Sequence, residues 1–437
     1  KSERFPLSCF FLLQFPKFPM PSPPRVFLVT GANRGMGLEV ARQLVDDHAI
    51  DVVLACRRRD ACEAAVEEIN NHRRRRQQSS STSTSSTPTP SSSSPLPRAR
   101  AAPLPLDLSS PRSVFAFVEA MKKEDEILDG IVLNAGISPS PPPSVSDSDA
   151  SSPSPSPSSL LLPLPPPFPE GWSPSAVDDA LATNHVGHFA LVQGLLENKT
   201  IKKGARVVAV SSRASAAGEL KKSENEKENK DGTPLLLLPS LAPRLSSPFR
   251  SYSRSKLANV LFCRELARRN RKGANGKEGG EGEGEKEGGK EEKEGGFDLF
   301  VAATSPGLVR TPLARGFALS AAASAVPSWM PLRCAAISVL SSLAEGVASF
   351  WGQSAEKGAT STVVAATATA EEGGEKQKLF PSCSSNFAFF HGRKQADWLL
   401  SRQATNGELA AQLWRATEAV VAEARRRWEE EEEKRRG

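Results

Sequence analysis

Two side chains suited to proton transfer stand four residues apart in SYSRSKLANV, residues 251–260, which holds the only tyrosine of the chain, Tyr252. Lys256 follows at the spacing that brings two side chains to one face of a helix. A phenol, with an ordinary pKa of about 10, is a poor catalyst at neutral pH. A lysine charge at about 4 Å, with an effective dielectric near 20, contributes about 4 kcal/mol, or roughly three pKa units. The pattern predicts that Lys256 lowers the pKa of Tyr252 into a working range.

A lone Y-x-x-x-K pattern also fits a packed aromatic whose hydroxyl reaches the surface. Ser211 and Ser212 favour the catalytic interpretation, because they end a predicted strand ahead of this helix. Doubly wound sheets bind ligands at the carboxyl ends of their strands. Ser212 could there hold a substrate carbonyl oxygen beside Tyr252.

A glycine-rich turn in VTGANRGMGLE, residues 29–39, suits a phosphate ligand. Gly31, Gly35 and Gly37 follow a predicted strand and open a predicted helix, where a backbone without Cβ atoms can approach a pyrophosphate. Many turns use glycine for positive φ alone. The strand and helix on either side make a dinucleotide site the favoured interpretation.

The end of the next strand, ACRRRD, indicates which dinucleotide binds. Cys56 and Arg57 stand where an NAD enzyme would hold a ribose-binding acid. Arg57, with Arg34 of the glycine turn, supplies guanidinium groups for an adenosine 2′-phosphate. In the alternative, both arginines face solvent and Asp60 binds the ribose hydroxyls. We expect NADP(H) to be preferred over NAD(H).

The elements that must position these residues alternate between apolar runs and segments of helical period, which indicates β-α-β units. The predicted strands are 26–30, 50–56, 103–107, 130–134, 205–211 and 297–303. The predicted helices lie near 38–45, 114–121 (opened by Ser110 and Pro111), 177–196 and 252–272. The expected fold class is α/β, a single Rossmann-type doubly wound parallel sheet with helices on both faces.

Four low-complexity tracts interrupt this pattern and are expected to be disordered insertions in loops: 79–94, 138–169, 219–248 and 273–296. The expected domain is 25–421, followed by a charged tail at 422–437, most simply a solvated helix end. Residues 1–24 are an N-terminal extension that is expected to be the remnant of a targeting segment. Alternatively, translation begins at Met20 and the residues before it are not translated.

Composition narrows the function classes. The 56 basic and 50 acidic residues nearly balance, which disfavours nucleic acid as the partner; the run 73–76 of four arginines is an anion patch or, more simply, a solvated linker. Six cysteines without paired spacing favour an intracellular compartment, cytoplasmic, plastid or membrane-peripheral. No apolar run is long enough to predict a spanning helix. His185 and His188 lack metal-binding company, so we expect no metal and interpret them as helix packing or site lining.

The motifs together resemble the short-chain dehydrogenase/reductase family. The matching features are T-G-x-x-x-G-x-G at 30–37, Asn134-Ala135-Gly136, Asn184, Ser212 and the Tyr252/Lys256 pair. SYSRSKLANVLFCRELARR, SPGLVRT at 305–311, KGATSTVVAATA at 357–368 and LWRATEAV at 413–420 resemble its retinol-dehydrogenase-like branch. The resemblance covers residues 25–421 apart from the tracts.

This resemblance implies roles for particular residues. Tyr252 is the proton donor or acceptor, Lys256 lowers its pKa and holds the nicotinamide ribose, Ser212 orients the carbonyl, and Asn184 anchors a water that relays protons. The implied cofactor-binding residues, besides Tyr252 and Lys256, are Gly31, Asn33, Arg34, Gly35, Met36, Gly37, Arg57, Asp107, Leu108, Asn134, Ala135, Gly136, Pro306, Gly307, Val309 and Thr311.

Three features depart from the family pattern. Ser212 and Tyr252 are 40 positions apart, Ser305 stands where this branch commonly has His, and KLFPSCSS near 378–385 is a poor seventh strand. The long insertion ahead of Tyr252 borders the expected site and could alter substrate access.

The sequence thus predicts an NADP(H)-dependent oxidoreductase that interconverts a carbonyl and an alcohol by hydride transfer. The expected substrate is a small apolar aldehyde, ketone or alcohol, retinal-like or lipid-derived, because residues 317–351 are rich in apolar side chains. That segment covers the substrate, packs on the core, or contacts a membrane surface. The family also implies a homodimer. The alternative function is a catalytically silent NADP(H)-binding scaffold or redox sensor.

Overall fold

The computed structural model describes residues 25–81, 97–138, 172, 179–220, 248–274, 299–310, 339–340, 342, 352–367 and 387–437. Its strands are β1 (Val26–Thr30), β2 (Asp51–Ala55), β3 (Ala99–Ala101), β4 (Leu128–Leu133), β5 (Ile201–Val210), β6 (Phe300–Ser305), β7 (Phe387–His391) and β8 (Lys394–Gln395). Its α-helices are α1 (Gly35–His48), α2 (Arg59–Ser81), α3 (Pro111–Lys123), α4 (Asp179–Leu181), α5 (Gly187–Glu197), α6 (Pro248–Ala274), α9 (Ala355–Thr367) and α10 (Gly407–Arg436). The π-helix η3 (Ala182–Val186) joins α4 to α5, and two 3₁₀ turns are η4 (Arg213–Ala217) and η5 (Asp397–Leu399).

The strands form one sheet in the order β3-β2-β1-β4-β5-β6-β7-β8. The first seven run parallel, and β8 pairs antiparallel with β7. The expected doubly wound fold is therefore confirmed. The strand order reverses between β1 and β4, which is where sheets of this kind bind ligands.

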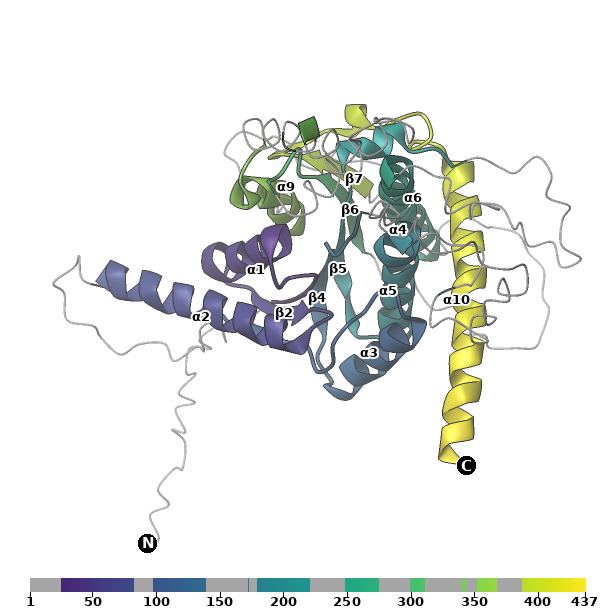
Figure 1. Cartoon of the computed structure of the whole chain (residues 1–437), viewed down its shortest axis with the longest axis horizontal. Coiled ribbons are helices and arrows are strands. Elements are labelled where there is room, and N and C mark those ends of the chain that lie inside the picture. The colour runs from purple at the N-terminus through teal and green to yellow at the C-terminus, as the bar shows by residue number, and fades with distance from the viewer. Residues whose placement is uncertain are drawn as a thin grey trace, which may run out of the picture.

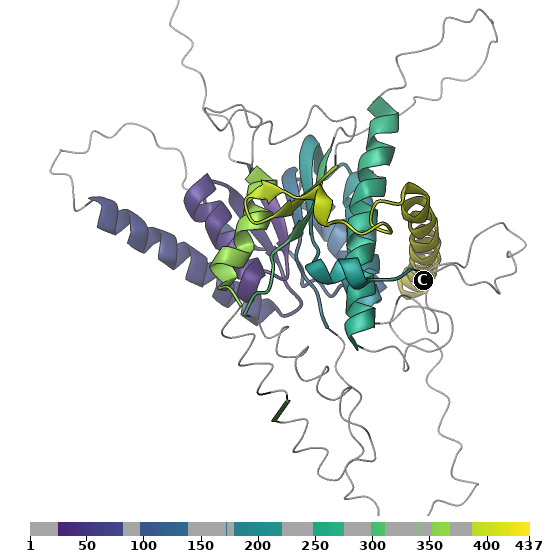
Figure 2. The same ribbon diagram turned by 90° about the horizontal axis from the view of Figure 1, so that it is seen from above.

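Helices cover both faces of the sheet, with α1, α2 and α9 on one face and α3, α5, α6 and α10 on the other (Figures 1 and 2). The layering follows from the strand sequence, because successive side chains point to opposite faces. In β4, Ile131 and Leu133 join the core under α5 and α6, whereas Val132 between them joins the core under α1 and α9. Each buried strand thus holds helices on both of its faces.

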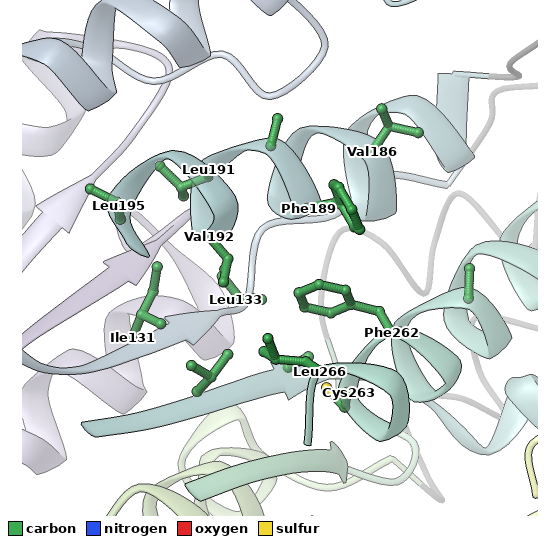
Figure 3. Packing of buried hydrophobic residues seen from close by; sticks show 14 of the residues in the cluster. Ile131, Leu133, Val186, Phe189, Leu191, Val192, Leu195, Phe262, Cys263 and Leu266 are labelled. Atoms are coloured by element: carbon green, nitrogen blue, oxygen red, sulfur yellow. The ribbon is translucent and has the colours of Figure 1, made fainter. Parts of the chain in front are cut away.

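The core beside α6 is aromatic. Phe189 of α5 and Phe262 of α6 face one another over the apolar side chains of β4 (Figure 3), with ring centroids 5.7 Å apart. Trp414 of α10 packs edge-on against Phe189 at 4.7 Å and stacks on Phe262 at 5.8 Å. Such aromatic pairs contribute about 0.5–1.5 kcal/mol each beyond area burial. Helix α10 therefore holds α5 and α6 together.

The strand expected at 103–107 is wrong. The third strand is β3 (Ala99–Ala101). Beyond it, up to Leu106, only the amides of Ala102 and Leu106 donate to the segment of β2, to the carbonyls of Leu54 and Cys56 at 2.9 Å each. Pro103 and Pro105 have no N–H, so a regular ladder cannot form there. The expected cap of the next helix is confirmed, because the Ser110 side chain accepts from the Ser113 amide and Pro111 opens α3.

The arginine run 73–76 is neither an anion patch nor a linker. It lies in α2, where the Arg73 guanidinium donates to the carbonyls of Val45 and Asp46 at the end of α1, and Arg76 pairs with Asp47 at 2.8 Å. Positive groups are stabilised by the exposed carbonyls at a helix C-terminus. Two of the four arginines thus dock α2 on α1.

Other expected segments are longer, shifted or outside the described residues. Helix α2 continues through Ser81 into the first predicted tract, and α10 continues through the charged tail, where Trp428 packs on Phe115 at 5.4 Å. The poor strand near 378–385 and most of residues 317–351 lie outside the described residues, and the seventh strand is β7. Among the helices that are described, none is both long and apolar enough to cross a membrane.

Candidate active site

Tyr252, Lys256 and Ser212 come together where β5 ends and α6 begins its second turn. Tyr252 and Lys256 are 6% and 3% exposed, and the Lys256 ammonium lies 5.5 Å from the centre of the Tyr252 ring. The Tyr252 phenol is hydrogen-bonded with the Ser212 side chain. Ser212 and Tyr252 are thus in contact although they are 40 positions apart in the sequence. Ser211 points elsewhere, since its hydroxyl donates to the Lys256 carbonyl at 2.8 Å.

Asn184 joins this group from the π-helix η3. Its side-chain oxygen accepts from the Ile137 amide at 2.7 Å, and its Nδ2 donates to the Ile137 carbonyl at 3.0 Å and to the Ser255 hydroxyl at 2.9 Å. Ser255 in turn donates to the Tyr252 carbonyl at 2.8 Å. A π-turn offsets the side chains that follow it by one residue, and such turns are frequent at functional sites. Asn184 thereby links the chain after β4 to the helix that bears Tyr252.

Burial sets the charge state of the two titratable groups. It raises the pKa of Tyr252 to about 12, although the hydrogen bond with Ser212 opposes the rise. It lowers the pKa of Lys256 to about 8. The Lys256 ammonium donates to the Val210 carbonyl at 3.0 Å. Desolvation of the phenolate is the main cause of the raised Tyr252 pKa. The lowering of this pKa by Lys256, expected from the sequence, stays a prediction.

The single tyrosine makes this pKa directly measurable. The raised value means that the folded chain holds the phenolic proton more tightly than the unfolded chain, so folding stability falls as pH rises from about 10 towards 12. We expect a tyrosinate absorbance midpoint near pH 12 in the folded protein and near pH 10 in denaturant. Circular dichroism at each pH verifies that the chain is folded. A folded midpoint at or below about 10 would restore the role assigned to Lys256 from the sequence.

The glycine turn has the shape that a bound pyrophosphate requires. Gly31 has φ +64°, in the left-handed region, and its amide bonds the Ala55 carbonyl at 2.8 Å. A Cβ on Gly37 would come within 3.0 Å of the Gly31 carbonyl oxygen and of the Asn134 side chain. Helix α1 begins at Gly35 without a side-chain cap, so its first amides remain available to an anion. These features fit the phosphates of a dinucleotide.

Two arginines at this edge of the sheet are available for a ligand. Arg34 and Arg57 are exposed, and neither forms an ion pair with any residue in the described ranges. Their neighbour Arg58 instead pairs with Asp60, which lowers the pKa of Asp60 to about 2 and occupies the carboxylate offered as the alternative ribose ligand. The arrangement favours a phosphate at Arg57.

The buried thiol of Cys56 explains why no acid stands at the end of β2. It is 3% exposed, is hydrogen-bonded with the Cys62 thiol, and accepts from the amides of Ala32 and Asn33 in the glycine turn. The hydrogen bond with Cys62, together with burial, raises the pKa of Cys56 above its ordinary value, so the thiol is neutral. A carboxylate in this apolar contact would carry a desolvation cost.

Comparison with known proteins shows which families the chain resembles. The sequence model of the KR domain matches residues 26–150. Human retinol dehydrogenase 12 is 31% identical over 247 residues, which cover 56% of this chain and 57% of that protein. These matches support the resemblance to the short-chain dehydrogenase/reductase family. Within this family it resembles the retinol-dehydrogenase-like branch, as the sequence motifs predicted.

Two further similar proteins have lower sequence identity to this chain. WW domain-containing oxidoreductase of Drosophila melanogaster is 29% identical over 248 residues, which cover 56% of this chain and 45% of that protein. The chain spans about half the length of the curated relatives it matches. Among solved structures, L-sorbose reductase from Gluconobacter frateurii complexed with NADPH and L-sorbose has a TM-score of 0.43 at 15% identity, covering 84% of this chain and 95% of that one.

The remaining residues that the family resemblance singled out lie at several strand ends. Gly136, after β4, lies against Asn184 and Lys256, since a Cβ there would be 3.3 Å from the Lys256 ammonium. Gly307 follows β6 with φ +77°, and Val309 pairs with Gln353. Asp107 accepts from the amide and hydroxyl of Ser109, while the Leu108 carbonyl accepts from the Trp172 indole. Asn33 and Met36 are half-buried in the glycine turn, Ala135 is half-buried beside Asn134, Pro306 precedes Gly307, and Thr311 lies outside the described residues.

Sequence reasoning missed two polar residues that hold this site together, namely Thr30 and Ser255. Thr30 stands in the glycine motif and Ser255 stands between Tyr252 and Lys256, so position alone could have drawn attention to both. The sequence favoured helix packing or site lining for His188, without choosing between them. Within the described part of the chain, no three His, Cys, Asp or Glu side chains cluster as metal ligands would.

Proposed function

We propose that this chain is an NADP(H)-dependent oxidoreductase that interconverts a carbonyl and an alcohol, with residues 25–421 as its catalytic unit. The observation that carries the proposal is the meeting of Tyr252, Ser212, Lys256 and Asn184 beside Gly136, at the sheet edge that also bears the glycine turn. NADPH, when bound, supplies a hydride to the carbonyl carbon.

The protein side of this reaction is proton transfer and orientation. The pKa of Tyr252, about 12, keeps its phenol protonated at neutral pH, so Tyr252 can act as the proton donor in carbonyl reduction. Ser212 orients the carbonyl oxygen beside the phenol. When Tyr252 has donated its proton, the charged form of Lys256 stabilises the phenolate. Because the pKa of Lys256 is about 8, this stabilisation weakens above that pH.

The proposed substrate is a small apolar aldehyde or ketone of retinal-like or lipid-derived type. Support comes from the relatives of matching sequence that bear the name retinol dehydrogenase, including the human proteins 12 and 14. The deciding test is NADPH oxidation by the full chain against a panel of apolar aldehydes, ketones and quinones. Turnover that saturates with an apolar carbonyl supports the proposal. Tight NADPH binding without turnover of any carbonyl would favour the silent scaffold or redox sensor.

The preference for NADPH rests on Arg57 in this proposal. Replacing Arg57 by Ala should raise the Kd for NADPH by about ten- to a hundredfold, since a hydrogen bond to a charged group contributes about 1.5–3 kcal/mol. The Kd for NADH should not change, because NADH lacks the 2′-phosphate. Both constants can be measured by the fluorescence of the bound nicotinamide.

Arg58→Ala is the matched control for this change. Arg58 is the exposed neighbour of Arg57, but its guanidinium pairs with Asp60. We expect Arg58→Ala to leave both constants as in the wild type. Equal losses of NADPH and NADH affinity in Arg57→Ala would contradict the assignment of Arg57 to the 2′-phosphate.

A further inference from the structure

A chain of buried hydrogen bonds runs through His188 between the end of β1 and η3. The hydroxyl of Thr30 lies 2.9 Å from His188 Nε2, and His188 Nδ1 lies 3.0 Å from the Asn184 carbonyl oxygen. The same hydroxyl oxygen accepts from the amides of Asn134 and Ala135 at 3.0 Å each. Thr30 and Asn184 are fully buried and His188 is 2% exposed, so water cannot replace these bonds without local opening.

One assignment of hydrogens satisfies every group in this chain. The Asn184 carbonyl can only accept, so His188 Nδ1 carries the proton and Nε2 of the neutral ring accepts. Thr30 must then donate to Nε2, which leaves both of its lone pairs for the amides of Asn134 and Ala135. Burial, together with the nearby Lys256 charge, lowers the pKa of His188 to about 4 and keeps the ring neutral. His188 therefore contacts the end of β1 through Nε2 and η3 through Nδ1.

The Asn184 end of the chain continues to the catalytic helix. Asn184 Nδ2 donates to Ser255, whose hydroxyl donates to the carbonyl of Tyr252. We infer that His188 is a positioning residue for the proposed reaction, because it holds η3 and the Tyr252 turn of α6 in fixed relation to the 134–136 turn. This inference rests on the proposed function for its kinetic consequence. The contacts themselves do not depend on that function.

His185 provides a matched control on the same helical segment. It is also a buried histidine at 2% exposure, but its Nε2 bonds the Thr417 hydroxyl of α10 at 3.0 Å, away from the catalytic group. His188→Phe removes both hydrogen bonds of His188 at similar volume. His185→Phe makes the same substitution three residues earlier. Any loss that follows merely from removing a buried histidine should appear in both variants.

We expect His188→Phe to lower kcat by about ten- to a hundredfold, because a misplacement of about 1 Å can cost that much. The Kd for NADPH should change little, since Thr30 keeps its bonds to Asn134 and Ala135. His188→Asn should recover most of kcat, because its amide can donate to the Asn184 carbonyl from the place of Nδ1. His185→Phe should keep kcat within about twofold of the wild type, although it lowers the melting temperature.

Absorbance of the single tyrosine gives a second readout that needs no turnover. Loosening the bonds from Asn184 through Ser255 exposes the phenol, so the tyrosinate midpoint of His188→Phe should fall from near 12 towards 10, while that of His185→Phe stays in place. Wild-type turnover with equal kcat losses in the two Phe variants, or with none in either, would overturn the inference. If the wild type lacks turnover, an unchanged midpoint in His188→Phe overturns it and a fall supports it, whatever becomes of the proposed function.

Discussion

Tyr252→Phe should lower kcat for carbonyl reduction by about 10²- to 10⁴-fold, the range that a positioned general acid contributes. The change removes one hydroxyl and keeps the ring that is buried beside Lys256. Without that hydroxyl, Ser212 can still contact a carbonyl oxygen, but its own hydroxyl has no comparable proton to donate at neutral pH. The measurement is single-turnover oxidation of NADPH with a saturating apolar aldehyde.

The Kd for NADPH separates this chemical loss from a loss of binding. We expect Tyr252→Phe to bind NADPH within about tenfold of the wild type, since one neutral hydrogen bond contributes about 0.5–1.5 kcal/mol. Ser212→Ala should lower kcat less than Tyr252→Phe does, because it removes orientation and keeps the proton donor. Retention of more than about a tenth of wild-type kcat by Tyr252→Phe would assign the proton to another group.

Gly37→Ala should weaken NADPH binding, because the turn has no space for a methyl group. The added Cβ would lie within 3.0 Å of the Gly31 carbonyl oxygen, which is a backbone atom and cannot rotate away. Overpacking of this kind costs about 1–3 kcal/mol, equivalent to about a five- to 150-fold loss if it falls on the cofactor-binding conformation. Titration of nicotinamide fluorescence measures the Kd directly.

Gly407→Ala is the control for the general effect of adding a methyl group. Gly407 opens α10, and a Cβ there would meet no atom within 4 Å. We expect this variant to bind NADPH as the wild type does and to be at least as stable, since Ala has the higher helix propensity. Wild-type affinity in Gly37→Ala would show that the turn can move aside, and the dinucleotide would then have to be assigned to another part of the sheet edge.

Local patterns in the sequence predicted most of the sheet, because strands buried on both faces need continuous apolar runs. β1, β2, β4, β5 and β6 each overlap a predicted strand. The apolar residues of PLPLD led to a wrong prediction of the third strand at that segment. Its two prolines have no N–H to donate to a strand ladder. β7, in contrast, is the run FAFFH, which follows the segment near 378–385 that was interpreted as a poor seventh strand.

The sequence by itself determined which residues could do chemistry: the Tyr252/Lys256 spacing, the three glycines after β1, and an arginine in place of an acid after β2. Those features are local, since they depend on helical period and backbone conformation within a few residues. Only the tertiary structure decided the charge states of the buried side chains and their hydrogen-bond partners. The pKa of Tyr252 rises because α6 is packed so deeply that burial disfavours the phenolate. His188 gained its role because it lies between Thr30, 158 residues away in sequence, and Asn184. Burial and long-range hydrogen bonds belong to the packed fold, and no spacing in the sequence encodes them directly.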